Sequence, residues 1–296
     1  MKTNLDTLLI ALYVELDDHV VIPRPVRPGG FTPKLTDAEL VCLAVAQVLL
    51  GFASEHHWLR FCRTRLGHLF PYLPGQPGYN RRLRAARPLL QRAIVHVASR
   101  SPSWWDDLWL ADSTPVPCAA SRQTVDRSAL WGHAGYGYCA SHSRFFWGFR
   151  LHLLTAGDGL PVMWCLAHPK LGDREVLAAM LDRDHRLVRA GQVIVADKGY
   201  AGRDIEALVA GYGARLVRPD RRDERRRHGD LGGVRQWIES VNDTMKGQLS
   251  LEQHGGRTTT GVFVRVAQRL LAMAAAIWHN WTTGQTTKRS LTAYDH

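Results

Sequence analysis

Two aspartates in this sequence follow short apolar runs, a pattern typical of the carboxyl ends of buried strands. Asp197 follows the run at residues 192–196, and Asp112 follows the run at residues 109–111. Short β-branched runs bounded by turn residues read as core strands, and sites in open α/β sheets gather where strands end. We therefore expect the two carboxylates to lie level with each other at one edge of a sheet. Pro115 is expected to stop the first strand.

A third carboxylate, Glu239, lies in a segment with helical periodicity at residues 234–246. The apolar residues of this segment recur at helical spacing and are Val234, Ile238, Val241 and Met245. At about 100° per residue, Arg235, Glu239 and Lys246 form one stripe beside the apolar face. The stripe would present a cation, an anion and a cation.

Three carboxylates on a basic chain favour a divalent-metal site for phosphoryl transfer, with Asp112, Asp197 and Glu239 as ligands and catalytic residues. Mg²⁺ prefers oxygen ligands and binds through a few carboxylates plus substrate phosphates. Taken singly, an aspartate after a strand is more often a turn former or a helix cap. The metal-site interpretation depends on all three carboxylates, Asp112, Asp197 and Glu239, occurring together in the expected positions. Asp173, which precedes Arg174 and Glu175, is interpreted as a helix N-cap.

The order and spacing of these residues resemble the DDE transposases of bacterial insertion sequences. Their signature is Asp, Asp, then Glu within Arg-x3-Glu-x6-Lys, and it matches Asp112, Asp197 and the Arg235, Glu239, Lys246 stripe. Further stretches most similar to the insertion-sequence 982 family lie at residues 110–117, 134–138, 146–152 and 196–200.

One position departs from a related pattern. Insertion-sequence 4-type members place a tyrosine three residues before the arginine, where this chain has Gly232. Whatever that tyrosine contributes must come from elsewhere in this chain or be absent.

The resemblance implies a ribonuclease H-like, retroviral-integrase-like catalytic domain that uses two Mg²⁺ ions, for which Mn²⁺ can substitute. It implies hydrolysis of phosphodiester bonds at the element ends and joining of the freed 3′-hydroxyl ends to target DNA. The partners would be double-stranded DNA, at the terminal inverted repeats and the target, and a second copy of the chain, because two ends must be brought together. Arg235 and Lys246 would hold phosphates near the scissile bond.

Composition agrees with a polyanionic partner. The chain has 296 residues, a formal net charge of +11 and a pI near 9.8, and basic proteins release counterions when they neutralise phosphates. The five cysteines are scattered, which excludes a zinc knuckle or a disulfide framework and fits a reducing cytoplasm near the nucleoid. The apolar runs at 40–53 and 270–278 are shorter than the roughly 20 residues that span a bilayer, so no membrane association is expected.

Residues 1–100 predict an all-helical region, which is followed by a catalytic domain at 101–282 and a polar, frayed tail at 283–296. Thr36 and Glu39 have capping-box spacing at the start of one helix, which Gly51 would close. A later helix carries Arg81, Arg82 and Arg84. Such arginine-rich helices suit either a DNA-binding helical module or an ordinary bundle with a solvated basic face. The resemblance favours binding of the terminal repeats.

The catalytic domain is predicted to be α/β with a mixed five-stranded sheet in ribonuclease H-like order. The first strand is expected to end at residue 112, and the other four are expected at 145–155, 160–167, 192–196 and 214–218. Helices are expected at 173–188 and 203–210. Residues 119–143 form a long insertion with no clear period, and such loops are uncommon unless functional or disordered.

Arg221 and Arg222 belong to a charged run at residues 218–228. A mixed charge run is usually a solvated loop, but its place next to the Glu239 helix favours contact with phosphates. Two other interpretations remain open for the whole chain. One is a DNA-binding derivative of a transposase without catalysis, and the other is a ribonuclease H-like nuclease that cuts without joining.

Overall fold

The computed structural model describes residues 4–22, 33–139, 143–220, 232–292 and 294, and the side chains of residues 232, 234 and 235 are outside the description. The chain divides into two compact units. The first contains residues 1–101, 248–256 and 260–296, and the second contains 102–247 and 257–259. This division differs from the expected one, because the long C-terminal helix belongs with the N-terminal helices.

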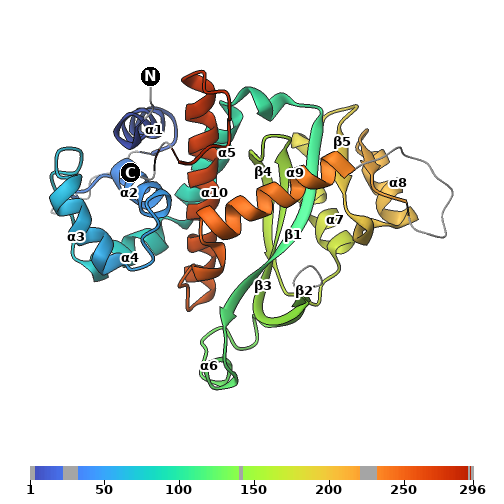
Figure 1. Ribbon diagram of the computed structural model, residues 1–296, viewed down its shortest axis with the longest axis horizontal. Helices are drawn as coiled ribbons and strands as arrows, with labels where there is room; N and C mark the ends of the chain where they lie inside the picture. The colour runs from blue at the N-terminus through green and yellow to red at the C-terminus, as the bar shows by residue number, and fades with distance from the viewer. Residues whose placement is uncertain (1–3, 23–32, 140–142, 221–231, 293, 295–296) are drawn as a thin grey trace. The chain divides into compact units, whose positions relative to one another are not determined.

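The first unit is built of α-helices, shown in Figure 1. Their bounds are α1 Leu5–His19, α2 Asp37–Leu49, α3 Glu55–Arg65, α4 Gln76–Ala85, α5 Arg87–Ser99 and α10 Thr259–Thr282. The predicted capping box at the start of α2 is confirmed: the Thr36 hydroxyl accepts from the Glu39 backbone N–H, and the Glu39 carboxylate accepts from the Thr36 N–H. Gly51, at φ +69°, follows the end of α2, where an αL residue is commonly a glycine.

Helix α10 is tied to the N-terminal helices by side-chain contacts. The Arg265 guanidinium forms an ion pair with Glu55 of α3, and the Gln268 amide donates to the Ala44 carbonyl of α2 at 3.4 Å. The Arg87 guanidinium lies 4.1 Å from the centre of the Phe263 ring. These contacts join parts of the chain that are more than 170 residues apart in sequence.

The C-terminal segment after α10 is also part of this unit. The Tyr294 side chain is buried, and its hydroxyl donates to the Asn280 side chain of α10 at 2.6 Å. The expected frayed tail is therefore wrong for Tyr294, because a buried tyrosine with a hydrogen-bonded hydroxyl anchors the segment.

One helix, α10, is long and apolar enough by composition to cross a membrane. In the structure, however, 78% of its apolar window is buried against protein. A helix that is apolar around most of its circumference suits the core of a helical unit equally well.

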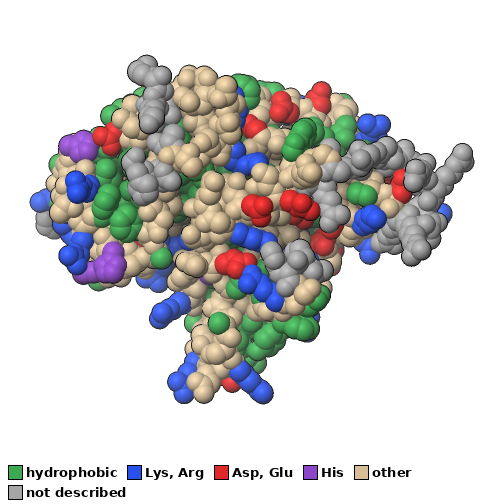
Figure 2. Space-filling view, in the orientation of Figure 1, with side chains coloured by type: hydrophobic (Ala, Val, Ile, Leu, Met, Phe, Trp, Pro, Cys, Tyr) green, Lys and Arg blue, Asp and Glu red, His purple; other side chains and the backbone are tan. Residues whose placement is uncertain are grey.

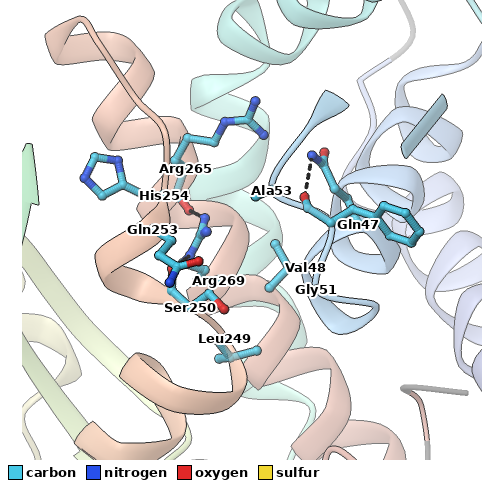
Figure 3. A pocket seen from close by; sticks show the side chains of 11 residues that line it. Gln47, Val48, Gly51, Ala53, Leu249, Ser250, Gln253, His254, Arg265 and Arg269 are labelled. Atoms are coloured by element: carbon cyan, nitrogen blue, oxygen red, sulfur yellow. Dashed lines mark hydrogen bonds between the residues drawn. The ribbon is translucent and has the colours of Figure 1, made fainter. Parts of the chain in front are cut away.

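The first unit contains a small cavity, shown in Figure 3, where α10 and the segment at residues 249–254 face the end of α2. Its volume is about 30 Å³, which suits one or two water molecules. Arg269 lines it and donates to the carbonyls of Ser250 and Arg265. These bonds attach the segment to α10, so the cavity has a structural explanation.

The second unit contains a mixed sheet of six strands (Figure 1). The strands are β1 Leu108–Ala119, β2 Gly135–Cys139, β3 Arg144–Ala156, β4 Pro161–Ala167, β5 Val193–Ala196 and β6 Arg215–Val217. Their order is β2-β3-β1-β5-β6, with β4 also paired to β3, and β1 runs parallel to β5 and antiparallel to β3. The helices are α6 Arg122–Asp126, α7 Asp173–Arg183, α8 Arg203–Gly211 and α9 Gly232–Asp243.

The sheet has one strand more than predicted, because the insertion at 119–143 contributes β2 and α6. Two glycines let β2 lie close to its neighbours: a Cβ at Gly135 would lie 2.2 Å from the His168 ring, and one at Gly137 would lie 2.7 Å from the Phe146 ring. The insertion therefore has regular structure that its composition did not predict.

Strand β1 does not stop at Pro115 as expected. Its antiparallel ladder with β3 continues through Pro115 and Pro117, which face Arg150 and Gly148. Prolines two residues apart place their missing N–H groups on the same edge of a strand. Because the β3 ladder persists, that edge is the one that faces away from β3.

Helices cover both faces of the sheet (Figure 1). Asp112 contacts Asn242 of α9, whereas the next residue along β1, Ser113, contacts Asp173 of α7. Successive side chains of a strand point to opposite faces, so α9 lies on one face and α7 on the other. The site is therefore built at the level of Asp112 and Ser113.

A small apolar cluster fixes α9 to its face of the sheet. It consists of Leu110, Val195 and Val217 from three neighbouring strands and Ile238 from α9, all buried. Leu110 precedes Asp112 by two residues and so points to the same face. Packing at Leu110 thus positions the carboxylate beside it.

Replacing Leu110 by alanine should destabilise the second unit by about 2–5 kcal/mol, because it removes a buried side chain and leaves a cavity under α9. Thermal and denaturant unfolding followed by circular dichroism would measure the change. Leu171→Ala is the matched control, since Leu171 is 40% exposed and its truncation should have little effect. Equal stability of the two variants would contradict this account of the core.

Candidate active site

Asp112 and Asp197 come from neighbouring parallel strands and lie at the same level. The β1–β5 ladder pairs Ala111 with Ala196, and each aspartate is the next residue of its strand. Asp112 lies within the long strand β1, while Asp197 lies just past the end of β5. Both carboxylates therefore lie at the level where the β1–β5 ladder ends.

Asp112 is held by α9 and is surrounded mainly by protein. The Asn242 side-chain amide donates a hydrogen bond to Asp112 Oδ2. The pKa of Asp112 is raised to about 6, first by burial and to a smaller extent by the charges of Asp197 and Asp173, against hydrogen bonds from Ser113 and Asn242 that lower it. Desolvation thus exceeds the stabilisation that the two hydrogen bonds provide.

Asp197 begins a tight turn. Its Oδ1 accepts a hydrogen bond from the backbone N–H of Gly199 at 2.8 Å, which caps the 3₁₀ turn Lys198–Tyr200. Tyr200 is fully buried, and its pKa is raised first by burial and then by the charges of Asp173, Asp112 and Asp197. One buried ring therefore lies within electrostatic reach of three aspartates.

Asp173 is not the N-cap that was predicted for α7. Gly172 is the N-cap residue, and Asp173 is the first residue of the helix. Its Oδ1 accepts from the Ser113 hydroxyl at 2.8 Å and from Arg150 Nη1 at 3.3 Å. The position of Asp173 at the start of a predicted helix suggested an N-cap. The sequence pattern therefore predicted no role for Asp173 in the site. The signal that could have indicated its role was the polar side of β3, which carries Arg150 two residues before His152.

His152 lies beside this group in the protein interior. It is 2% exposed, and neither ring nitrogen has a hydrogen-bond partner among the described residues. Its Nδ1 lies 3.7 Å from Asp173 Oδ1, just beyond hydrogen-bond distance. Burial lowers the pKa of His152 to about 4 despite the opposing effect of Asp173, so the imidazole is neutral at physiological pH.

Glu239 lies on α9 one turn before Asn242, and its side chain is exposed. Because residues three apart lie on the same side of a helix, the contact from Asn242 to Asp112 brings the Glu239 side of α9 towards the two aspartates. Figure 2 shows Asp and Glu side chains gathered over α9. Lys246 is half-buried in the π-helical turn Thr244–Gln248 that continues α9.

Other predicted contact residues fall in different parts of the structure. Arg81 and Arg84 are exposed on α4, but Arg82 is used inside the first unit, where it donates to the Leu35 carbonyl at 2.6 Å and to Asp37 at 2.8 Å. The side chain of Arg235 and all of Arg221 and Arg222 lie outside the described residues.

The chemistry of these side chains suits a hard divalent cation. Asp112 and Asp197 make no ion pair with any described residue, and carboxylate oxygens are the ligands that Mg²⁺ and Mn²⁺ prefer. Across the described part of the chain, no three His, Cys, Asp or Glu side chains stand at metal-ligand spacing. The donors therefore fit in type, and cation binding would have to draw the carboxylates together.

Comparison with known proteins identifies the family of the chain. Residues 106–275, more than half of the chain, match the family model described as "Transposase DDE domain". No curated protein and no solved structure gave a match to the chain. The matched range includes Asp112, Asp173, Asp197 and Glu239.

The raised pKa of Asp112 predicts a pH-dependent cost in stability. Its folded pKa of about 6 lies above the ordinary 3.8, so the wild type loses stability as pH rises from about 4 through about 6. Asp112→Asn cannot ionise, and at about pH 7.5 it should be more stable than wild type by about 1–2 kcal/mol, allowing for partial exposure. At about pH 4 the difference should vanish.

Thermal unfolding in a metal chelator at both pH values would measure this. Asp126→Asn is the control, since Asp126 is exposed on α6 and its replacement should change little. An Asp112→Asn variant that is less stable than wild type at both pH values would contradict the account.

Proposed function

The chain belongs to the transposase DDE domain family, and from this premise we propose that it is the transposase of an insertion sequence, most similar to the insertion-sequence 982 family. It binds the terminal inverted repeats of the element, hydrolyses phosphodiester bonds there, and joins the 3′-hydroxyl ends to target DNA. The observation that carries the proposal is the convergence of Asp112 and Asp197 at one level of neighbouring strands, with Asn242 fixing the Glu239 helix beside them.

We propose that the second unit has a ribonuclease H-like fold. In support, the strand order β4-β3-β1-β5-β6 combines three antiparallel strands with two parallel ones. Strand β1 provides one aspartate, the second follows the end of β5, and α9, which packs on the sheet, carries the glutamate. The extra strand β2 extends the sheet alongside β3 without altering this order.

In the proposed mechanism Asp112, Asp197 and Glu239 would hold two Mg²⁺ ions, for which Mn²⁺ could substitute. Bound there, such ions would supply Lewis acidity, which favours deprotonation of the attacking water or 3′-hydroxyl and offsets charge on the leaving oxygen. Asn242 holds Oδ2 of Asp112 and thereby fixes the direction in which the carboxylate points. Lys246 and Arg235 hold phosphates of the substrate close to the carboxylates.

DNA binding is proposed to involve both units. Arg81 and Arg84 are exposed on α4 and can contact phosphates of a terminal repeat. Arg82 is better explained as an anchor of α2, because Asp37 and the Leu35 carbonyl already occupy its guanidinium. Arg221 and Arg222 would contact phosphates near the carboxylates. Pairing of two element ends requires at least a dimer on DNA, in a cytoplasmic location at the nucleoid.

Replacing the carboxylates one at a time tests this proposal against its alternatives. Asp197→Asn and Glu239→Gln each remove one negative charge without changing shape, and each should lower cleavage and joining by about 100- to 1,000-fold, the usual cost of one preorganised electrostatic group. The assay uses a labelled duplex that carries the terminal repeat of the element, with Mg²⁺. Binding of the duplex should be retained in both variants.

Glu175→Gln serves as the control, because Glu175 is exposed on α7 and its replacement should leave both reactions intact. Wild-type protein that cuts but never joins ends to a second duplex would identify a nuclease. Wild-type protein that binds the repeat but cuts in neither Mg²⁺ nor Mn²⁺ would identify a DNA-binding derivative.

The arginines of α4 give a separate prediction for binding. Replacing Arg81 and Arg84 together by alanine should weaken binding uniformly across sequences, and the slope of log K against log salt should fall by about 0.9 for each phosphate that the variant no longer neutralises. Fluorescence anisotropy over a salt series would measure the slope. Replacing Arg92, which is exposed on α5, is the charge-matched control. An unchanged slope would exclude α4 from the DNA interface.

A further inference from the structure

We propose that exposed aromatic rings of β2 and β3 form a surface that stacks on unpaired DNA bases. The rings belong to Tyr136 and Tyr138 of β2 and to Phe145 of β3, and they are 55%, 47% and 77% exposed. We call these three residues the aromatic surface. The inference rests on the proposed function, because that function supplies a DNA substrate. It assigns a DNA contact to a part of the chain outside the Asp, Asp, Glu pattern.

The three rings share one face of the sheet. Tyr136 and Tyr138 are two residues apart on β2, so their side chains point the same way. The antiparallel ladder pairs Tyr138 with Phe145 of β3, and directly opposite residues of a ladder also share a face. The centres of these two rings lie 5.0 Å apart. The paired rings therefore present one aromatic surface to solvent, with Tyr136 on the same face.

The alternation along β2 is the reverse of that in a strand that only covers a core. Its packed side carries Gly135 and Gly137, where a Cβ would lie 2.2 Å and 2.7 Å from neighbouring rings. Its solvent side carries the two tyrosines. Burial of an aromatic ring is a large source of stability, and these tyrosines leave about half of that source unused. Packing of β2 therefore does not explain why tyrosines occupy its solvent side.

The charges near the aromatic surface favour a polyanionic partner. Arg144 precedes Phe145, and α6, which follows the end of β1 that pairs with this part of β3, adds Arg122 and Arg127. All three arginines are exposed. Residues 119–145 contain one aspartate and no glutamate to set against them. Figure 2 shows Lys and Arg side chains at the α6 end of the unit, with hydrophobic side chains beside them.

This combination suits single-stranded DNA better than a second copy of the chain. Proteins that bind single strands pair cations that hold the phosphate backbone with aromatic rings that stack on the bases. Two copies meeting through the same face would instead bring like charges together, which costs free energy. The occupant that we assign is therefore a DNA strand with unpaired bases.

The aromatic surface lies on the face of the sheet that carries Asp112. Asp112 pairs with Leu153 across the β1–β3 ladder. Phe145 is an even number of residues from Leu153 on β3, so alternation places the two side chains on one face. At about 3.4 Å per residue, the stretch of β3 between them spans about 27 Å. DNA that is cut beside Asp112 has room to continue along this face, and a strand that has lost its pairing there offers bases to the rings.

Binding of a single-stranded oligonucleotide tests the inference without cleavage. The probe is a fluorescein-labelled dT oligomer of about 15 nucleotides, and its partner is an abasic oligomer of the same length and charge. Fluorescence anisotropy with the full chain in a chelator should show that wild type binds the dT oligomer more tightly. Tyr138→Ala and Phe145→Ala should each weaken dT binding by about 5- to 150-fold. Neither should change binding of the abasic oligomer, because the phosphate contacts remain.

Two further substitutions separate stacking from burial of apolar area. Tyr138→Phe keeps the ring and should bind the dT oligomer as wild type does, whereas Tyr138→Leu stays apolar without a ring and should bind as weakly as Tyr138→Ala. Tyr72→Ala is the control, since Tyr72 is a tyrosine of the first unit that is 42% exposed. Thermal unfolding checks that each variant folds, and the Phe145→Ala result decides the matter if a Tyr138 variant does not.

The outcomes distinguish this inference from the proposed function. If both alanine variants bind the dT oligomer as tightly as wild type, or if wild type does not prefer it to the abasic oligomer, the aromatic surface does not stack on bases. Alanine variants that lose a dimer in sedimentation velocity without DNA, with dT binding unchanged, would overturn the inference in favour of a contact between two copies. Cleavage and joining of the terminal-repeat duplex judge the proposed function separately. Wild type that stacks on dT but neither cuts nor joins would overturn that function alone.

Discussion

Repulsion between carboxylates held together at the end of β5 is the constraint on which the second unit depends. Separate elements must bring Asp112, Asp173 and Asp197 near one another, although like charges in partly buried surroundings favour separation. The fold opposes this with packing and with hydrogen bonds. The Leu110 cluster fixes α9, and Asn242 of that helix holds Asp112. On the other face Ser113 and Arg150 hold Asp173.

The same constraint explains why the site lies where the ladder of two parallel strands ends. The β1–β5 ladder ends at Ala111 and Ala196, so prolines 115 and 117 interrupt no hydrogen bond of that ladder. Strand β1 keeps its pairing with β3 beyond that point, so Asp112 lies on a strand that remains hydrogen-bonded where the β5 ladder has ended. The candidate site thus lies where the parallel ladder ends and the long antiparallel pairing with β3 persists.

Much of this could be predicted from local pattern, because periodicity and strand length are local properties. The strands that precede Asp112 and Asp197, the capping box at Thr36 and the helix that carries Glu239 all follow from spacing. Asp173 could not be predicted, since its role arises from contacts with β1 and β3, 23 or more residues away in sequence. Strand β2 was missed because glycines and exposed tyrosines give no clear alternation. The length of β1 was missed because prolines normally end strands.

The composition of the first unit bears on how the chain is made. Helix α10 supplies Arg265 to Glu55 and Gln268 to Ala44, so α2 and α3 lack part of their core until residues beyond 260 have been synthesised. Domains generally fold as they emerge during synthesis, which lets the sheet unit assemble while the earlier helices still wait for α10. During that interval the apolar residues of α2 are partly uncovered, and the first unit, although it begins earlier in the chain, is completed after the second.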